Sequence, residues 1–195
     1  MNDLKQLFGS YNICARFAPG FLFITSIYLL LGYDIKNFKS NSIFSIALLI
    51  ILSGVCGFVS ASIIKFAERF IWDKFNNPII RYLKKKEKEL YRKLLDKYKD
   101  TKEEKEINNF IVAEILKCTR GDNKTFWKNI SYGFFRNSIL LSFICLLFSY
   151  SSKYCQYFYI NIAIFLFILL MTFISAGYYA HQIIESYKEI TLEDK

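Results

Sequence analysis

The residues best suited to chemistry in this sequence are cationic side chains gathered in one stretch. They are Lys84, Lys85, Lys86, Lys88, Arg92 and Lys93. Because ammonium and guanidinium groups neutralise phosphates without reading bases, this basic face could bind a nucleotide or an oligonucleotide. Acidic residues lie among these cations, and such pairs keep a long helix soluble, so a solvated face near anionic lipids is an equally good interpretation for a monomer. In a symmetric oligomer, several copies of the face would form a positive ring able to hold a polyanion.

A second candidate site is a run of small residues further along the same half of the chain. Ser53, Gly57 and Ala61 are four residues apart and so share one face of a helix, with Ser60 beside them. Small side chains let two membrane helices approach closely, and helix packing is the favoured interpretation. The same weakly polar face would also suit the wall of a pore in an oligomer.

A third group of residues lies where long apolar stretches begin or end. This group comprises Arg16, Arg136, Asn137, His181 and Glu185. Charges within a membrane are costly and often functional, whereas long side chains near a span end can reach the interface, and both interpretations stay open. An ion pair between Arg136 and Glu185 is feasible if their helices are neighbours.

We expect neither a metal site nor an enzyme site. The five cysteines include no CxxC pair and His181 is the only histidine, so zinc ligands are too few. The sequence contains no phosphate-binding glycine loop, GxSxG or HExxH motif, and the apolar stretches hold no paired acidic residues. We therefore expect no cofactor.

The elements that must position these candidates are four apolar stretches at 14–32, 43–64, 134–150 and 157–179. The chain is 53% hydrophobic and 18% aromatic, which is more than a soluble domain of 195 residues needs for its core. Each stretch is close to the roughly 20 residues with which a helix crosses a bilayer, and the short alternating segments of a membrane barrel are absent. The sequence therefore predicts an all-α, polytopic membrane protein with four transmembrane helices.

The basic residues predict the orientation of these helices. Most of the net charge of +9 comes from residues 65–131, and positive residues favour the cytoplasmic side. We expect both termini and this insert to be cytoplasmic, with the protein in the cell inner (plasma) membrane. The predicted parts are an N-terminal tail with two spans (1–64), the basic insert (65–131), two further spans (132–182) and a cytoplasmic tail (183–195).

The insert between the second and third spans should form a helical hairpin. Asn76-Asn77-Pro78 predicts a kink or stop, because proline disfavours helical geometry in the residue before it. A single Lys-rich helix is expected after it, followed by a second helix over 107–118 and a closing turn at 121–123.

Two short motifs resemble a known family: residues 15–20, ARFAPG, and residues 129–137, NISYGFFRN. With four spans and a charged insert, they resemble the channel-like effector of Hailong-type anti-phage defence systems. The resemblance implies a homo-oligomeric channel controlled by the nucleic-acid product of a partner nucleotidyltransferase. Opening of this channel would halt growth of an infected cell. Other four-span defence proteins, such as the membrane component of Kiwa systems, fit as well. A membrane scaffold that recruits a cytoplasmic partner through the hairpin is the alternative function.

Overall fold

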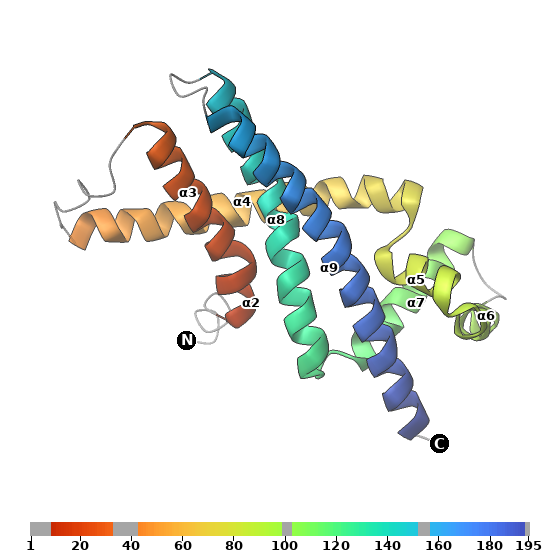
Figure 1. The fold of residues 1–195 in the computed structure, drawn as a ribbon. Coiled ribbons are helices and arrows are strands. Elements are labelled where there is room, and N and C mark those ends of the chain that lie inside the picture. The colour runs from red at the N-terminus through yellow and green to blue at the C-terminus, as the bar shows by residue number, and fades with distance from the viewer. Residues whose placement is uncertain (1–8, 33–42, 99–102, 152–156, 194–195) are drawn as a thin grey trace. The chain divides into compact units, whose positions relative to one another are not determined.

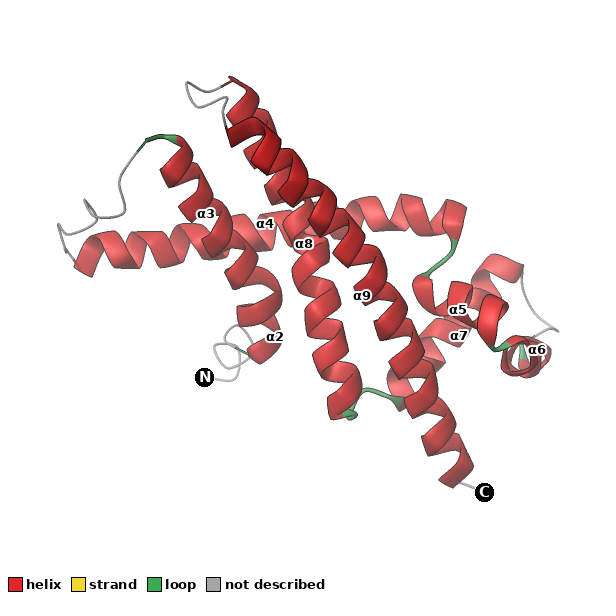
Figure 2. Cartoon of the chain, in the orientation of Figure 1, coloured by secondary structure: helices red, strands yellow, loops and turns green. Residues whose placement is uncertain are grey.

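The computed structural model describes residues 9–32, 43–98, 103–151 and 157–193 (Figure 1). These residues are almost entirely helical and contain no strand (Figure 2), so the predicted all-α class is confirmed. In chain order the elements are α2 (Ser10–Asn12), a π-helical turn η1 (Ile13–Phe17), α3 (Ala18–Leu30), α4 (Ile43–Phe75), α5 (Pro78–Lys86), α6 (Lys88–Lys97), α7 (Glu104–Cys118), α8 (Asn123–Ser151) and α9 (Phe158–Glu193).

Four helical segments in the described chain are long and apolar enough to cross a membrane. They are Ser10–Leu30, Ile46–Trp72, Asn123–Tyr150 and Phe158–Thr191. Large apolar side chains such as Ile51, Leu170 and Phe173 point away from the protein on these helices. Such outward-facing apolar surface is what lipid chains require of a spanning helix.

The chain divides into two compact units. Unit 1 consists of Met1–Ala67 and Ile130–Phe173, and unit 2 consists of Glu68–Asn129 and Ile174–Lys195. The helices α4, α8 and α9 each contribute residues to both units. Within the predicted tail, 183–195, α9 continues as a helix to Glu193. The reason is an apolar stripe, Ile183, Ile184 and Tyr187, which is buried in unit 2.

The core of unit 2 brings α5, α6, α7 and α9 together. Its buried residues are Ile79, Ile80, Leu83, Leu94, Ile107, Ile111, Ile115, Ala180, Ile183, Ile184 and Tyr187. The three isoleucines of α7 recur every fourth residue and so face one side of that helix, as their spacing predicts. Phe110 on the same helix is outside this core: it is 43% exposed and stacks on Tyr98.

The expected kink before the Lys-rich segment is confirmed in detail. Asn76 adopts a positive φ of 62°, and the side chain of Asn77 accepts a hydrogen bond from the backbone N–H of Ile79 at 2.9 Å. Pro78 then opens α5, a position where its missing N–H costs nothing. The single helix expected after this cap is instead two helices, α5 and α6, separated at Glu87. This break lets the apolar side chains of both helices reach the same core.

Candidate functional site

A groove of about 560 Å³ runs along α5 and α6 in unit 2. Lys84, Lys88, Tyr91, Arg92, Leu95 and Asp96 line it, and we call it the basic groove. Lys88 and Arg92 are four residues apart on α6 and so share one face of that helix, whereas Lys84 reaches the groove from α5, before the break at Glu87. The groove therefore combines three cations with a single carboxylate, and the Tyr91 ring and Leu95 supply apolar surface. Its volume lies in the range of small-molecule sites, about 300–1,000 Å³.

Contacts from α7 hold the wall of the basic groove in place. The Nζ atom of Lys84 donates to Oε1 of Glu104 at 2.8 Å and lies 5.4 Å from the centre of the Tyr91 ring. The hydroxyl of Tyr91 donates to Oδ1 of Asn108 at 2.9 Å. The hydrogen bond to Glu104 raises the pKa of Lys84 and lowers the pKa of Glu104, so both groups are charged at neutral pH.

The ion pair between Lys84 and Glu104 is weak enough to be exchanged. The Glu104 side chain is 68% exposed, and exposed pairs of this kind contribute no more than about 1 kcal/mol. A phosphate entering the basic groove can therefore replace the Glu104 carboxylate on Lys84 at little cost.

The structure separates the six cations of the predicted basic face into two sets. Lys84, Lys88 and Arg92 line the basic groove, whereas Lys85, Lys86 and Lys93 do not line it. The latter three are exposed on the same two helices. The apolar part of the lining was not predicted, although Tyr91 and Leu95 follow Lys88 at three and seven residues and so share its helical face.

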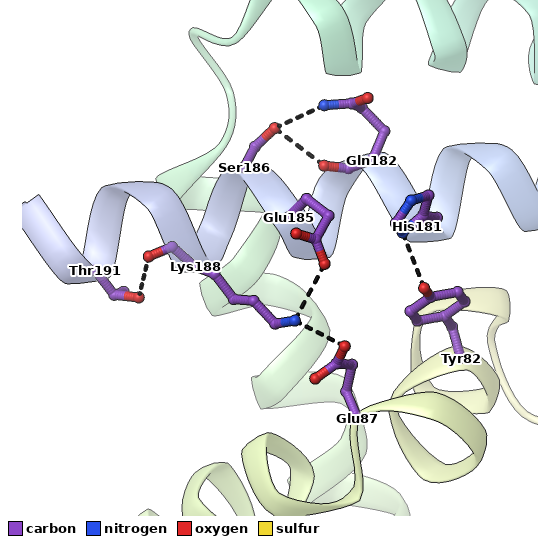
Figure 3. Close-up of polar contacts among 8 residues, drawn as sticks. All are labelled: Tyr82, Glu87, His181, Gln182, Glu185, Ser186, Lys188 and Thr191. Atoms are coloured by element: carbon purple, nitrogen blue, oxygen red, sulfur yellow. Dashed lines mark hydrogen bonds and ion pairs between the residues drawn. The ribbon is translucent and has the colours of Figure 1, made fainter.

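Contacts from α9 hold the break between α5 and α6 (Figure 3). The Nζ atom of Lys188 lies 2.7 Å from Oε1 of Glu87, the residue at the break, and 3.1 Å from Oε1 of Glu185. One turn away, a hydrogen bond of 2.8 Å joins the Tyr82 hydroxyl to Nδ1 of His181, and the two rings stack. Two residues expected at a span end, His181 and Glu185, therefore belong to a joint between α9 and the helices of the basic groove.

Two carboxylates hold the remaining elements of unit 2 together. Burial alone would raise the pKa of Glu114, but hydrogen bonds from Lys97, Tyr98 and Tyr187 outweigh it and lower that pKa. Asp122 accepts bonds from two backbone N–H groups at the start of α8 and from the Ser186 hydroxyl on α9. These bonds outweigh the effect of burial and bring the pKa of Asp122 down to about 2.

In unit 1 the small residues of α4 pack against the first helix. The carbonyl group of Arg16 occupies the space that a side chain at Gly57 would fill, and the backbone of Ser53 does the same at Gly20. Ser53, Ser60 and Ala61 are likewise buried. The predicted helix-packing role of this face is thus the one present here. A pore lined by the face would require these helices to separate.

Asn137 on α8 links the other two helices of this contact. Its side-chain Nδ2 donates to the backbone carbonyl oxygen of Ala15 at 2.7 Å, and its backbone carbonyl oxygen accepts from the Ser60 hydroxyl at 2.6 Å. Its Oδ1 atom also accepts from Nε of Arg136 at 3.2 Å. Arg136 belongs to unit 1 and Glu185 to unit 2, so their ion pair stays a prediction.

Arg16 projects from η1 between aromatic rings. Its guanidinium carbon lies 5.0 Å from the ring centre of Phe58 and 5.8 Å from that of Tyr11. Its Nε atom is buried and has no hydrogen-bond partner. Among the described residues, no group of three or more His, Cys, Asp or Glu side chains could hold a metal ion.

No family model, curated protein or solved structure matches this chain. The resemblance to Hailong-type effectors therefore stays a prediction based on its two motifs.

Proposed function

We propose that this protein is a homo-oligomeric membrane channel controlled by an anionic nucleotide or oligonucleotide that binds in the basic groove. The observation that carries the proposal is the position of Lys84 and Lys88 on either side of the Glu87 break, which Lys188 of α9 contacts. A ligand in the groove would thereby act on the same joint that connects α5 and α6 to α9.

The chemistry of the basic groove suits one nucleotide unit. Lys84, Lys88 and Arg92 can neutralise phosphates, and the ring of Tyr91 with Leu95 can contact a base through its apolar face, which gives little sequence preference. A longer oligonucleotide could continue along the exposed cations Lys85, Lys86 and Lys93 outside the groove.

The helix α9 provides the connection from ligand to membrane. It is continuous from Phe158 to Glu193, and its two ends belong to different units. If the ligand binds one arrangement of the Glu87 joint more tightly than another, α9 carries that preference toward its membrane span. The ligand must distinguish the two states, because a ligand of equal affinity for both shifts neither. Opening such a channel in a bacterial inner membrane would dissipate ion gradients and stop growth of an infected cell.

The test is conductance of the purified full-length protein in a planar bilayer, with and without short DNA oligomers on the side of unit 2. Two triple variants carry the same change of charge on the same helices. One replaces the groove cations (K84E, K88E and R92E), and the other replaces exposed cations outside the groove (K85E, K86E and K93E).

We expect discrete conductance steps whose frequency the oligomer changes, and a stronger effect at low salt. The groove variant should lose this response, while the matched variant should keep most of it. If both variants lose the response to the DNA oligomer equally, the response depends only on the net charge of α5 and α6 and not on the basic groove. If the protein is inserted and oligomeric but shows no conductance under any condition, the scaffold function is favoured.

A further inference from the structure

Unit 1 carries cations without acidic residues in its described part. Residues 9–32, 43–67, 130–151 and 157–173 include Arg16, Lys65 and Arg136 but contain no Asp or Glu. A guanidinium group keeps its charge at any physiological pH, and a charge in a membrane is costly unless an opposite charge or an acceptor is near. The described residues of this unit can offer neutral acceptors only.

The side chain of Arg16 is half-buried, and its Nε–H finds no acceptor among the described residues. The rings of Tyr11 and Phe58 lie close to its guanidinium and stabilise the cation. These rings do not replace a hydrogen bond to Nε, which is buried without a partner. A buried donor left without an acceptor is destabilising, and more so when the group is charged.

Contacts with two other helices hold the backbone around Arg16 in place. The residue lies in the π-helical turn η1, its carbonyl group packs against Gly57, and the preceding carbonyl is bonded to Asn137. Single π-helical turns within α-helices are frequent at functional sites. Six residues separate Arg16 from Ser10, where the candidate span begins, which is about 9 Å along the axis. A helix of 21 residues is about as long as the hydrocarbon layer is thick, so Arg16 would lie inside that layer, near enough to its edge for a long side chain to reach phospholipid phosphates.

We propose that Arg16 binds the phosphate group of an anionic membrane phospholipid. The phosphate oxygens would accept from the terminal N–H groups of the half-buried guanidinium, and a rotation of the side chain would bring the Nε–H into the paired geometry in which arginine binds phosphate best. Arg136, whose Nε is bonded to the same Asn137 that holds the Ala15 carbonyl, adds positive charge to this end of unit 1. The site is separate from the basic groove of unit 2 and does not depend on the proposed channel function.

The test measures lipid affinity of the full-length protein in a neutral detergent by native mass spectrometry. The probes are short-chain phosphatidylglycerol, phosphatidylcholine and inorganic phosphate, and the variants are R16Q and R16K. K65Q is the matched control, because Lys65 is an exposed cation of the same unit. R16K retains the charge and so guards against a folding defect in R16Q.

We expect phosphatidylglycerol to bind the wild type and K65Q alike, and R16Q to bind it at least about tenfold more weakly. R16K should bind with intermediate affinity, since a lysine offers a point charge without paired donors. Unchanged affinity in R16Q, or in R16K if R16Q fails to fold, would overturn the proposal. So would equal binding of inorganic phosphate, which would indicate a site for free phosphate, or a lack of preference for phosphatidylglycerol over phosphatidylcholine.

Discussion

Replacing Gly57 by alanine should destabilise unit 1, because the added methyl group has no room. A Cβ atom at Gly57 would overlap the carbonyl oxygen of Arg16 and lie 2.7 Å from its carbonyl carbon. Ordinary van der Waals contact begins at 3.4 Å, so α4 and η1 must separate by at least about 0.7 Å. Both partners are backbone atoms, which cannot rotate away as a flexible side chain could.

Asn137 makes this separation more costly. It is bonded to Ala15 on η1 and to Ser60 on α4, at 2.7 and 2.6 Å. When the two helices move apart, at least one of these bonds lengthens toward the limit of a useful hydrogen bond. Overpacking costs about 1–3 kcal/mol, and an interhelical hydrogen bond in a membrane protein is worth about 0.6–1.7 kcal/mol. We therefore expect Gly57→Ala to cost about 2–4 kcal/mol.

The assay is reversible unfolding of the full-length protein in SDS, followed by circular dichroism. Gly177→Ala is the control, since Gly177 also lies in a candidate span but nothing stands within 4 Å of a Cβ atom there. This control should change the free energy of unfolding by less than about 1 kcal/mol, in the stabilising direction that helix propensity gives. If Gly57→Ala costs no more than Gly177→Ala, the close contact of α4 with η1 is not present in the membrane protein.

Three further predictions concern unit 2. Ile111→Ala should cost about 2–5 kcal/mol in the same SDS assay, because Ile111 is fully buried, whereas Leu116→Ala, 41% exposed on the same helix, should cost under about 1 kcal/mol. Asp122→Ala should cost about 0.5–2 kcal/mol through loss of the α8 cap. Since the folded protein lowers the Asp122 pKa from 3.8 to about 2, the carboxylate contributes fully above pH 3.8. That contribution is lost as pH falls toward 2. The difference in free energy of unfolding between wild type and variant should therefore be clear at pH 5 and much smaller at pH 2. Lys188→Gln should leave binding of the DNA oligomer unchanged but weaken the effect of the DNA on conductance, because the ion pair with Glu87 is lost. Loss of DNA binding would instead place Lys188 in the ligand site.

Local pattern alone determined the helices of this protein and several of their ends. The four apolar stretches follow from composition, because only a helix satisfies its own backbone within lipid. The cap at Asn77 and Pro78 and the buried face of α7 at Ile107, Ile111 and Ile115 follow from short-range chemistry and the period of one helix. The six cations on α5 and α6 could likewise be recognised, since they are neighbours in the chain.

Tertiary structure decided which of these features act together. The break at Glu87 depends on packing against α9, and only this arrangement selects Lys84, Lys88 and Arg92 as groove residues. Arg16 meets Phe58 from α4, and its neighbour Ala15 meets Asn137 from α8, more than a hundred residues away in the chain. Spacing within one helix carries no information on such partners, because their position is set by how separate helices pack. The cations of the basic groove are therefore visible in the sequence, whereas their grouping across the break and the surroundings of Arg16 come from contacts between helices.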